Sequence, residues 1–142
     1  MFKSIVLALD GSETAKRGIP IAVELAKADR AKIVIAHVEE RMATKGRAPV
    51  HTNEEEIQAD LEALVKDLEA DGIDARIEMG DVMAGGSGVA HAIADIAEKA
   101  NGDLIVTGTR GHSAIEGLLV GSVTQRLLHI AKQPMLVVPA AD

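Results

Sequence analysis

The sequence contains no cysteine, no tryptophan and no tyrosine, and its single phenylalanine is Phe2. Without cysteine there are no disulfides, no cysteine-ligated zinc and no thiol catalysis. Without aromatic side chains there is no platform on which the bases of single-stranded nucleic acid stack. The net charge of −7 and the isoelectric point of about 5.2 also disfavour a phosphate backbone. We therefore expect no nucleic-acid partner.

Long apolar runs are also missing. None approaches the ~18 residues of a membrane-spanning helix, and the run before Asp10 is too short for a secretion signal. We therefore expect no membrane association and a cytoplasmic location. A length of 142 residues fits a single domain, 1–142, whose core must be built from aliphatic side chains.

Short apolar runs alternate with longer segments of helical periodicity along the chain. Four helices are expected: one from Ser12 onward that is kinked or starts late near Arg17 because of Pro20, one from Asn53 to Gly72, and two more at 89–101 and 122–131. Asn53 and Glu56 resemble a capping box. Strands are expected at 4–9, 32–38, 73–79, 104–107 and 135–138, of which 73–79 alternates enough to suggest a sheet edge, and loops are expected at 39–52 and 80–88.

This alternation predicts an α/β fold of three layers, in which helices cover both faces of a five-stranded parallel sheet. Ligands of such sheets bind beyond the carboxyl ends of the strands, where the strand order reverses. Asp10 follows the first strand and Gly108 follows the fourth. If these strands are neighbours, the order is 3-2-1-4-5 and both residues lie at the point of reversal.

A glycine-rich segment connects the fourth strand to the last helix. Residues 108–122 read GTRGHSAIEGLLVGS, in which Gly108, Gly111, Gly121 and Ser122 have the pattern G-x2-G-x9-G-S. Glycines allow the backbone to approach an oxygen closely, and the amino end of the following helix attracts anions. Ser122 is expected to contact a phosphate or cap the helix, and Arg110 to add a cation. The segment predicts a phosphate site.

This pattern, together with IVLALDGS at the first strand, IAHV at the second and QPMLVVP at the last, resembles the ATP-binding branch of the universal stress protein family over essentially the whole chain. The resemblance implies that Asp10 contacts the ribose and that the main chain of Val38 recognises adenine. It implies ATP as the ligand, and phosphate chemistry adds the expectation of Mg²⁺ bridging the phosphates. The other nucleotide contacts expected are Ala8, Thr107, Gly108, Arg110, Gly111, His112, Gly121, Ser122, Val123 and Thr124.

The resemblance also implies a homodimer that pairs through Met135–Val138, and a regulatory role in stress. Three alternatives stay open: an AMP or cyclic-AMP binder, a slow ATPase or adenylyl transferase, and a dimeric adaptor that needs no nucleotide. No G-x4-G-K-[ST], H-x-G-H or S-G-G-x-D-S motif is present, so we expect no catalytic residues and at most slow hydrolysis.

Residues 80–88 depart from the family pattern, and the histidines offer one further candidate for the site. Family members often have a short G-x-P turn where residues 80–88 read GDVMAGGSG, which leaves the specificity for base and phosphate number open. The five histidines have no metal-ligand spacing, so we expect no dedicated metal site and structural or solvated roles for His37, His91 and His129. His112 is the exception, since it lies within the glycine-rich segment.

Overall fold

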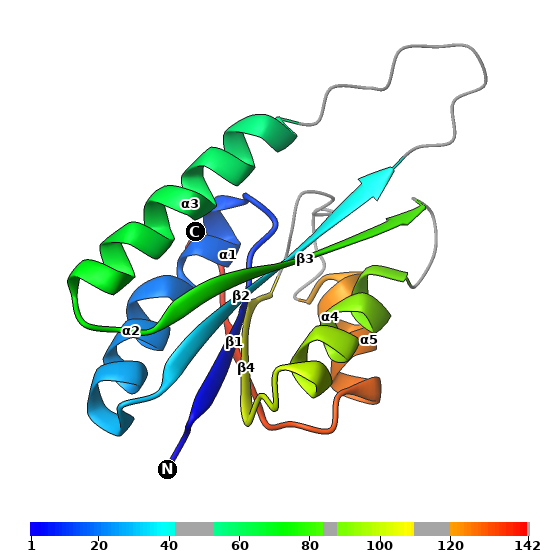
Figure 1. The fold of residues 1–142 in the computed structure, drawn as a ribbon. Helices are drawn as coiled ribbons and strands as arrows, with labels where there is room; N and C mark the ends of the chain where they lie inside the picture. Colours follow the sequence, from blue (N-terminus) through cyan, green and yellow to red (C-terminus); the bar gives the residue numbers. More distant parts are fainter. Residues whose placement is uncertain (42–52, 84–87, 110–119, 142) are drawn as a thin grey trace.

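The structure is a computed structural model that describes residues 1–41, 53–83, 88–109 and 120–141. Strands and helices alternate along the chain (Figure 1). The strands are β1 (Ser4–Ala8), β2 (Lys32–Arg41), β3 (Ala75–Met83), β4 (Leu104–Gly108) and β5 (Met135–Val138). The helices are α1 (Glu13–Lys16), α2 (Gly18–Asp29), α3 (Glu54–Ala70), α4 (Gly88–Lys99) and α5 (Ser122–Ile130).

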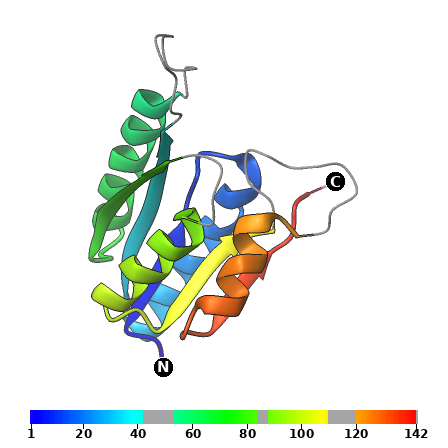
Figure 2. The same ribbon diagram turned by 90° about the vertical axis from the view of Figure 1, so that its right-hand side faces the viewer.

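The five strands form one parallel sheet in the order β3-β2-β1-β4-β5, which confirms the predicted topology. Helices α2 and α3 cover one face of the sheet, and α4 and α5 cover the other (Figures 1 and 2). Alternate side chains of the central strand β1 enter the two cores: Leu7 packs on the α2/α3 side and Val6 on the α4/α5 side. Both are fully buried. None of the described helices is long and apolar enough to cross a bilayer.

The four predicted helices are present as α2, α3, α4 and α5, and a single helical turn, α1, precedes α2. The predicted late start is confirmed, because α2 begins at Gly18, directly after Arg17. Pro20 therefore lies in the first turn of α2, where its missing N–H would have had no acceptor within the helix. Gly18 lets α2 approach the sheet closely, since an added Cβ would lie 3.0 Å from Cγ1 of Val106.

Two predicted loops begin later than expected, because β2 and β3 pair beyond the rest of the sheet (Figure 1). The prediction that residues 39–52 and 80–88 are loops is wrong for Glu39–Arg41 and Gly80–Met83, and for Gly88, which begins α4. Residues 39–41 pair in register with residues 81–83, and the guanidinium of Arg41 lies 3.3 Å from the carboxylate of Asp81. Backbone pairing with a neighbouring strand overrides the polar composition. Residues 42–52 and 84–87 lie outside the described residues.

The amino end of β1 is fixed by two aspartates that are distant in sequence. The carboxylate of Asp103, just before β4, accepts hydrogen bonds from the N–H groups of Lys3 at 2.8 Å and Ser4 at 3.1 Å. The carboxylate of Asp29 accepts the N–H of Phe2 at 2.7 Å and lies 3.2 Å from the terminal amino group. These contacts hold the pKa of Asp29 below its ordinary value, the Phe2 hydrogen bond being the larger cause. The start of the central strand is thus anchored to both neighbouring strand-and-helix units.

Candidate functional site

The turn after β1 places Asp10 at the carboxyl edge of the sheet. Oδ1 of Asp10 accepts the N–H of Ser12 at 2.9 Å, and Gly11 between them adopts a φ of 86°, a conformation natural to glycine. Oγ of Ser12 in turn accepts the N–H of Ala15 at 3.2 Å and caps α1. Asp10 is therefore a turn residue, and it also lies where a ligand of this sheet would bind.

The strand register brings Asp10, Val38 and Gly108 to the same edge. Ala8 pairs with Ala36, so Asp10 continues beside Val38; Leu7 pairs with Val106, so Gly108 lies beside Leu9. The predicted site residues from three neighbouring strands are thus brought together. The point of reversal lies between β1 and β4, as expected.

Ala8 and Thr107 lie at the ends of β1 and β4 with only 6% and 8% of their surface exposed. Ala8 belongs to the core on the α4/α5 side, and the partly buried side chains of Val38 and Val123 pack against that core.

The glycine-rich segment is held at both ends. The N–H of Gly121 donates to the carbonyl of Thr109 at 2.5 Å, and the hydroxyl of Thr124 donates to the carbonyl of Gly108 at 2.8 Å. Thr109 is itself bound to β5 through its N–H, 3.0 Å from the carbonyl of Val138. The end of β4 and the start of α5 are therefore joined directly. The predicted residues Arg110, Gly111 and His112 lie outside the described residues.

Gly108 is a site of close backbone approach. A Cβ at this position would lie 3.1 Å from three atoms of Thr14, two of them in its main chain. The end of β4 and α1 can therefore come together only because position 108 has no side chain.

The first turn of α5 presents backbone donors at this edge. Gly121 is its N-cap in an extended conformation, with φ −70° and ψ 162°, so no side chain caps the helix. The expectation that Ser122 caps the helix is wrong, because Ser122 is already the first helical residue, and its side chain is exposed. The first N–H groups of a helix have no acceptor within it, and the helix dipole is positive there. This turn is suited to an anion.

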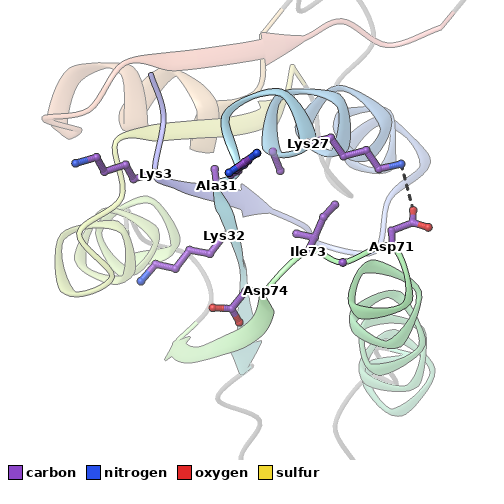
Figure 3. Close-up of a pocket in the computed structure, with 10 residues that line it drawn as sticks. Lys3, Lys27, Ala31, Lys32, Asp71, Ile73 and Asp74 are labelled. Atoms are coloured by element: carbon purple, nitrogen blue, oxygen red, sulfur yellow. Dashed lines mark ion pairs between the residues drawn. The ribbon is translucent and has the colours of Figure 1, made fainter.

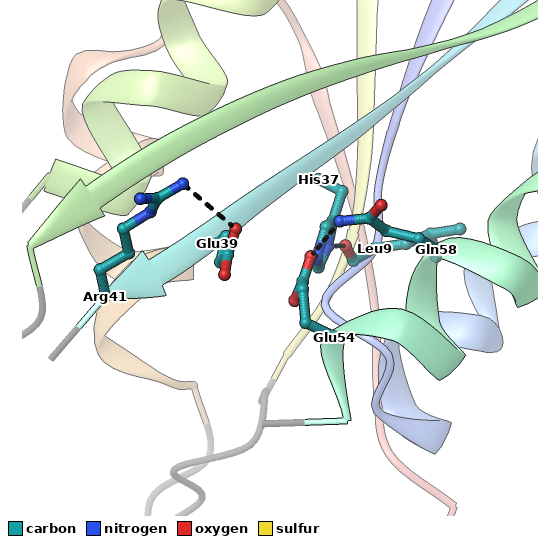
Figure 4. A network of polar contacts seen from close by, with 6 residues as sticks. All are labelled: Leu9, His37, Glu39, Arg41, Glu54 and Gln58. Atoms are coloured by element: carbon teal, nitrogen blue, oxygen red, sulfur yellow. Dashed lines mark hydrogen bonds and ion pairs between the residues drawn. The ribbon is translucent and has the colours of Figure 1, made fainter. Parts of the chain in front are cut away.

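A buried histidine lies directly behind this edge (Figure 4). His37 is 2% exposed; its Nδ1 lies 2.7 Å from the carbonyl oxygen of Leu9 and its Nε2 lies 2.8 Å from Oε1 of Glu54, at the start of α3. Gln58 also donates to that carboxylate, at 3.3 Å. The sequence indicated only a structural or solvated histidine at the end of a strand. Its partners are 28 and 17 residues away, so no local spacing pointed to them.

The same network corrects the predicted capping box. Asn53 is the N-cap of α3, but its side chain makes no capping hydrogen bond. Glu56, the expected partner, is exposed, whereas Glu54 faces His37. The helix start is held by the Asn53 carbonyl, which accepts the N–H of Ile57 at 2.8 Å, and by the Glu54–His37 contact.

A hollow of about 640 Å³ lies at the opposite, amino-terminal end of the sheet (Figure 3). Lys27 there is paired with Asp71 at 3.5 Å. The helices α2 and α3 end at this hollow, and the carboxyl end of a helix carries a partial negative charge that disfavours phosphate. The hollow is therefore distinct from the predicted site. Its charged residues are Lys3, Lys27, Arg30, Lys32, Asp71 and Asp74.

Among the described residues, no group of three or more histidine, aspartate or glutamate side chains is placed to hold a metal ion.

Residues 1–139 match the model of the Universal stress protein family. The chain belongs to the universal stress protein family. A universal stress protein from Thermus aquaticus, encoded in the QAH/OAS sulfhydrylase 3′ region, is 34% identical over 139 residues, which cover 97% of this chain and 99% of that protein.

Two solved structures with this fold contain adenine nucleotides. A universal stress protein in complex with cAMP is 26% identical, with a TM-score of 0.66 over 99% of this chain and 98% of that one. The universal stress protein from Archaeoglobus fulgidus in complex with dAMP is 20% identical, with a TM-score of 0.64 over 97% of this chain and 98% of that one. At this identity the second similarity shows the fold alone.

Proposed function

We propose that this universal stress protein binds an adenine nucleotide, with ATP and Mg²⁺ as the leading ligand, at the carboxyl edge of β1, β2 and β4. One observation carries the proposal: the two ends of the glycine-rich segment are joined beside the uncapped start of α5, next to Asp10 and Val38. This arrangement offers backbone donors for phosphates and a carboxylate for the ribose within one edge. The cAMP complex of the related universal stress protein supports an adenine nucleotide as the ligand class.

Phosphates would lie against the first turn of α5, where the N–H groups of Ser122 and Val123 and the dipole favour negative charge. Asp10 would accept hydrogen bonds from the ribose, and the main chain of Val38 would contact adenine. Mg²⁺ would be held by the phosphates and water. We propose a cytoplasmic regulatory protein with at most slow hydrolysis, since no motif for fast phosphoryl transfer is present.

The absence of tryptophan and tyrosine gives a direct test. Purified protein absorbs little in the near ultraviolet, so bound adenine would dominate its spectrum, and chromatography after acid denaturation would identify the nucleotide. Calorimetry with Mg-ATP, AMP and cyclic AMP then ranks the ligands. If no adenine is released and none of the three binds, the nucleotide-independent adaptor replaces this proposal.

The variant Asp10→Asn separates the two roles of Asp10. The amide oxygen of asparagine still accepts the N–H of Ser12, so the turn is kept while the charge is lost. We expect nucleotide affinity to fall about tenfold or more, because hydrogen bonds to a charged group contribute roughly 1.5–3 kcal/mol. Asp95→Asn, on an exposed residue of α4, is the matched control and should bind as the unsubstituted protein does.

We further propose that the protein forms a homodimer through β5. In the described sheet β5 pairs only with β4. The carbonyls of Pro134 and Val138 accept N–H groups of Ile105 and Thr109, so the backbone of alternate residues faces β4 and the backbone of Val137 faces outward. An edge strand of this kind, rich in aliphatic residues, is suited to pairing with a second copy.

A further inference from the structure

His37 connects three elements that meet behind the proposed nucleotide site. It belongs to β2, and only 2% of its surface is exposed to solvent. Its ring contacts Leu9 at the end of β1 and Glu54 at the start of α3. Both ring nitrogens are engaged, at 2.7 and 2.8 Å (Figure 4). An aliphatic side chain would fill this volume without needing a carboxylate beside it, so space filling alone does not explain the arrangement.

The partners fix the position of the ring hydrogens. A backbone carbonyl can only accept, so Nδ1 of His37 must carry a hydrogen and donate it to Leu9. The contact between Nε2 and Oε1 of Glu54 also needs a hydrogen between them. With both ring nitrogens held in this way, the ring is fixed in one orientation.

The atom held by Nδ1 is the carbonyl oxygen of Leu9, which precedes Asp10, the proposed ribose contact. Leu9 is bound on both sides, since its N–H donates to the carbonyl of Ala36 at 3.0 Å and its carbonyl accepts from His37. The carbonyl of Leu9 and the N–H of Asp10 lie in the same rigid peptide plane. Fixing the Leu9 carbonyl therefore fixes the direction in which the chain enters Asp10.

The residue that follows His37 in the sequence is Val38, whose main chain is the proposed adenine contact. Anchoring the His37 side chain to α3 also restrains the backbone of β2 at this point. A single side chain thus restrains the two strand ends proposed to contact ribose and base. Glu54 holds the side of the ring that faces away from Leu9. The exposed Glu55, next to it in the first turn of α3, makes no such contact with His37.

We propose that His37 is a positioning residue of the nucleotide site: its bond to the Leu9 carbonyl, held in place by Glu54, sets the orientation of Asp10 and Val38 for the nucleotide. This inference rests on the proposed function, and it adds a side chain that does not touch the ligand.

Two amide substitutions separate the two bonds of the ring. In His37→Asn the amide nitrogen lies close to the place of Nδ1 and can still donate to Leu9. In His37→Gln it lies nearer the place of Nε2 and reaches toward Glu54 while the Leu9 bond is lost. We expect the His37→Gln variant to bind Mg-ATP about tenfold more weakly than the unsubstituted protein, since one hydrogen bond corresponds to roughly this factor. The His37→Asn variant should recover most of the lost affinity.

Glu54→Gln tests the support of the ring, with Glu55→Gln as its matched control. Both substitutions remove one negative charge from the first turn of α3, so they change the helix dipole interaction equally. We expect Glu54→Gln to weaken binding severalfold and Glu55→Gln to leave it unchanged. Circular dichroism of each variant reports whether it is folded, and Glu54→Gln keeps the test available if His37→Gln does not fold.

Nuclear magnetic resonance gives a second test, because the signals of a merely structural histidine would not change when nucleotide is added. The Nδ1–H and ring nitrogen signals of His37 should shift when Mg-ATP is added, whereas the exposed His91 and His129 act as internal controls and should not. Suppose that the unsubstituted protein binds Mg-ATP, that the His37 signals do not shift, and that the His37→Gln variant binds as tightly as the His37→Asn variant. The inference about His37 is then overturned while the proposed function stands. If the unsubstituted protein binds no nucleotide, the proposed function fails and the inference fails with it.

Discussion

The hydrogen bond between Thr124 and Gly108 closes the glycine-rich segment, and its removal should be measurable as a loss of stability. Thr124 is 5% exposed, and its hydroxyl lies 2.8 Å from the Gly108 carbonyl. The other hydroxyl near that carbonyl, from Thr107, is 3.4 Å away and too long to replace it. Thr124→Val keeps the volume and removes the donor. We expect the free energy of unfolding to fall by about 1–2 kcal/mol, the cost of one buried bond and an unpaired acceptor.

Serine and alanine at position 124 divide this loss into its parts. Thr124→Ser keeps the hydroxyl and removes one buried methyl group, which costs about 0.8 kcal/mol. Thr124→Ala loses both, so its destabilisation should be near the sum, about 2–3 kcal/mol. The same order should hold for nucleotide affinity, because the bond positions the start of α5.

Urea unfolding followed by circular dichroism is the appropriate assay, because the chain has no tryptophan or tyrosine to report by fluorescence. With a slope of about 1–3 kcal/mol per molar urea, this loss of about 1–2 kcal/mol should shift the unfolding midpoint of the valine variant by roughly 0.3–2 M. A valine variant as stable as the unsubstituted protein, or more stable than the serine variant, would refute the argument that the hydroxyl holds the segment closed.

Three further predictions follow from other contacts. Gly102→Ala should destabilise by about 1–3 kcal/mol in urea, since its Cβ would lie 2.6 Å from Cγ2 of the fully buried Val6; an unchanged midpoint would contradict this packing. Asp29→Asn should be less stable than the unsubstituted protein at neutral pH. Because the folded pKa of Asp29 lies below 3.8, that difference should vanish as the pH falls below 3.8 and through the folded pKa; an acid titration with an unchanged difference would be the contrary result. Val137→Pro removes an outward N–H of β5 without affecting the β4 ladder, so light scattering should find monomers; a persistent dimer would exclude this interface.

The fold could be predicted from the sequence because each buried strand is a continuous apolar run. Such runs occur where parallel strands are covered on both faces, and their alternation with helices allows few topologies. Pro20 likewise indicated where α2 begins. These signals are local, and the structure confirms the strand order that they implied.

The remaining features depend on partners that are distant in sequence. Glu39 and Arg41 read as loop residues, but they lie beside a neighbouring strand that satisfies their backbone. Asn53 had the sequence of a helix cap, yet its neighbour Glu54 is held by a histidine 17 residues earlier. Long-range contacts of this kind decide the details of the site, and no local pattern encodes them.

The central position of β1 has a consequence for how the protein is made. This strand is synthesised first and is buried along its whole length, yet one of its two neighbours, β4, begins at Leu104, and the aspartate that fixes its first residues is Asp103. A nascent chain can pair β1 with β2 early, but one edge of β1 stays open until β4 has been synthesised. An open apolar edge invites pairing with other chains. Fragments that end before β4 should therefore aggregate, and the ribosome-bound protein has most need of protection between the synthesis of β2 and that of β4.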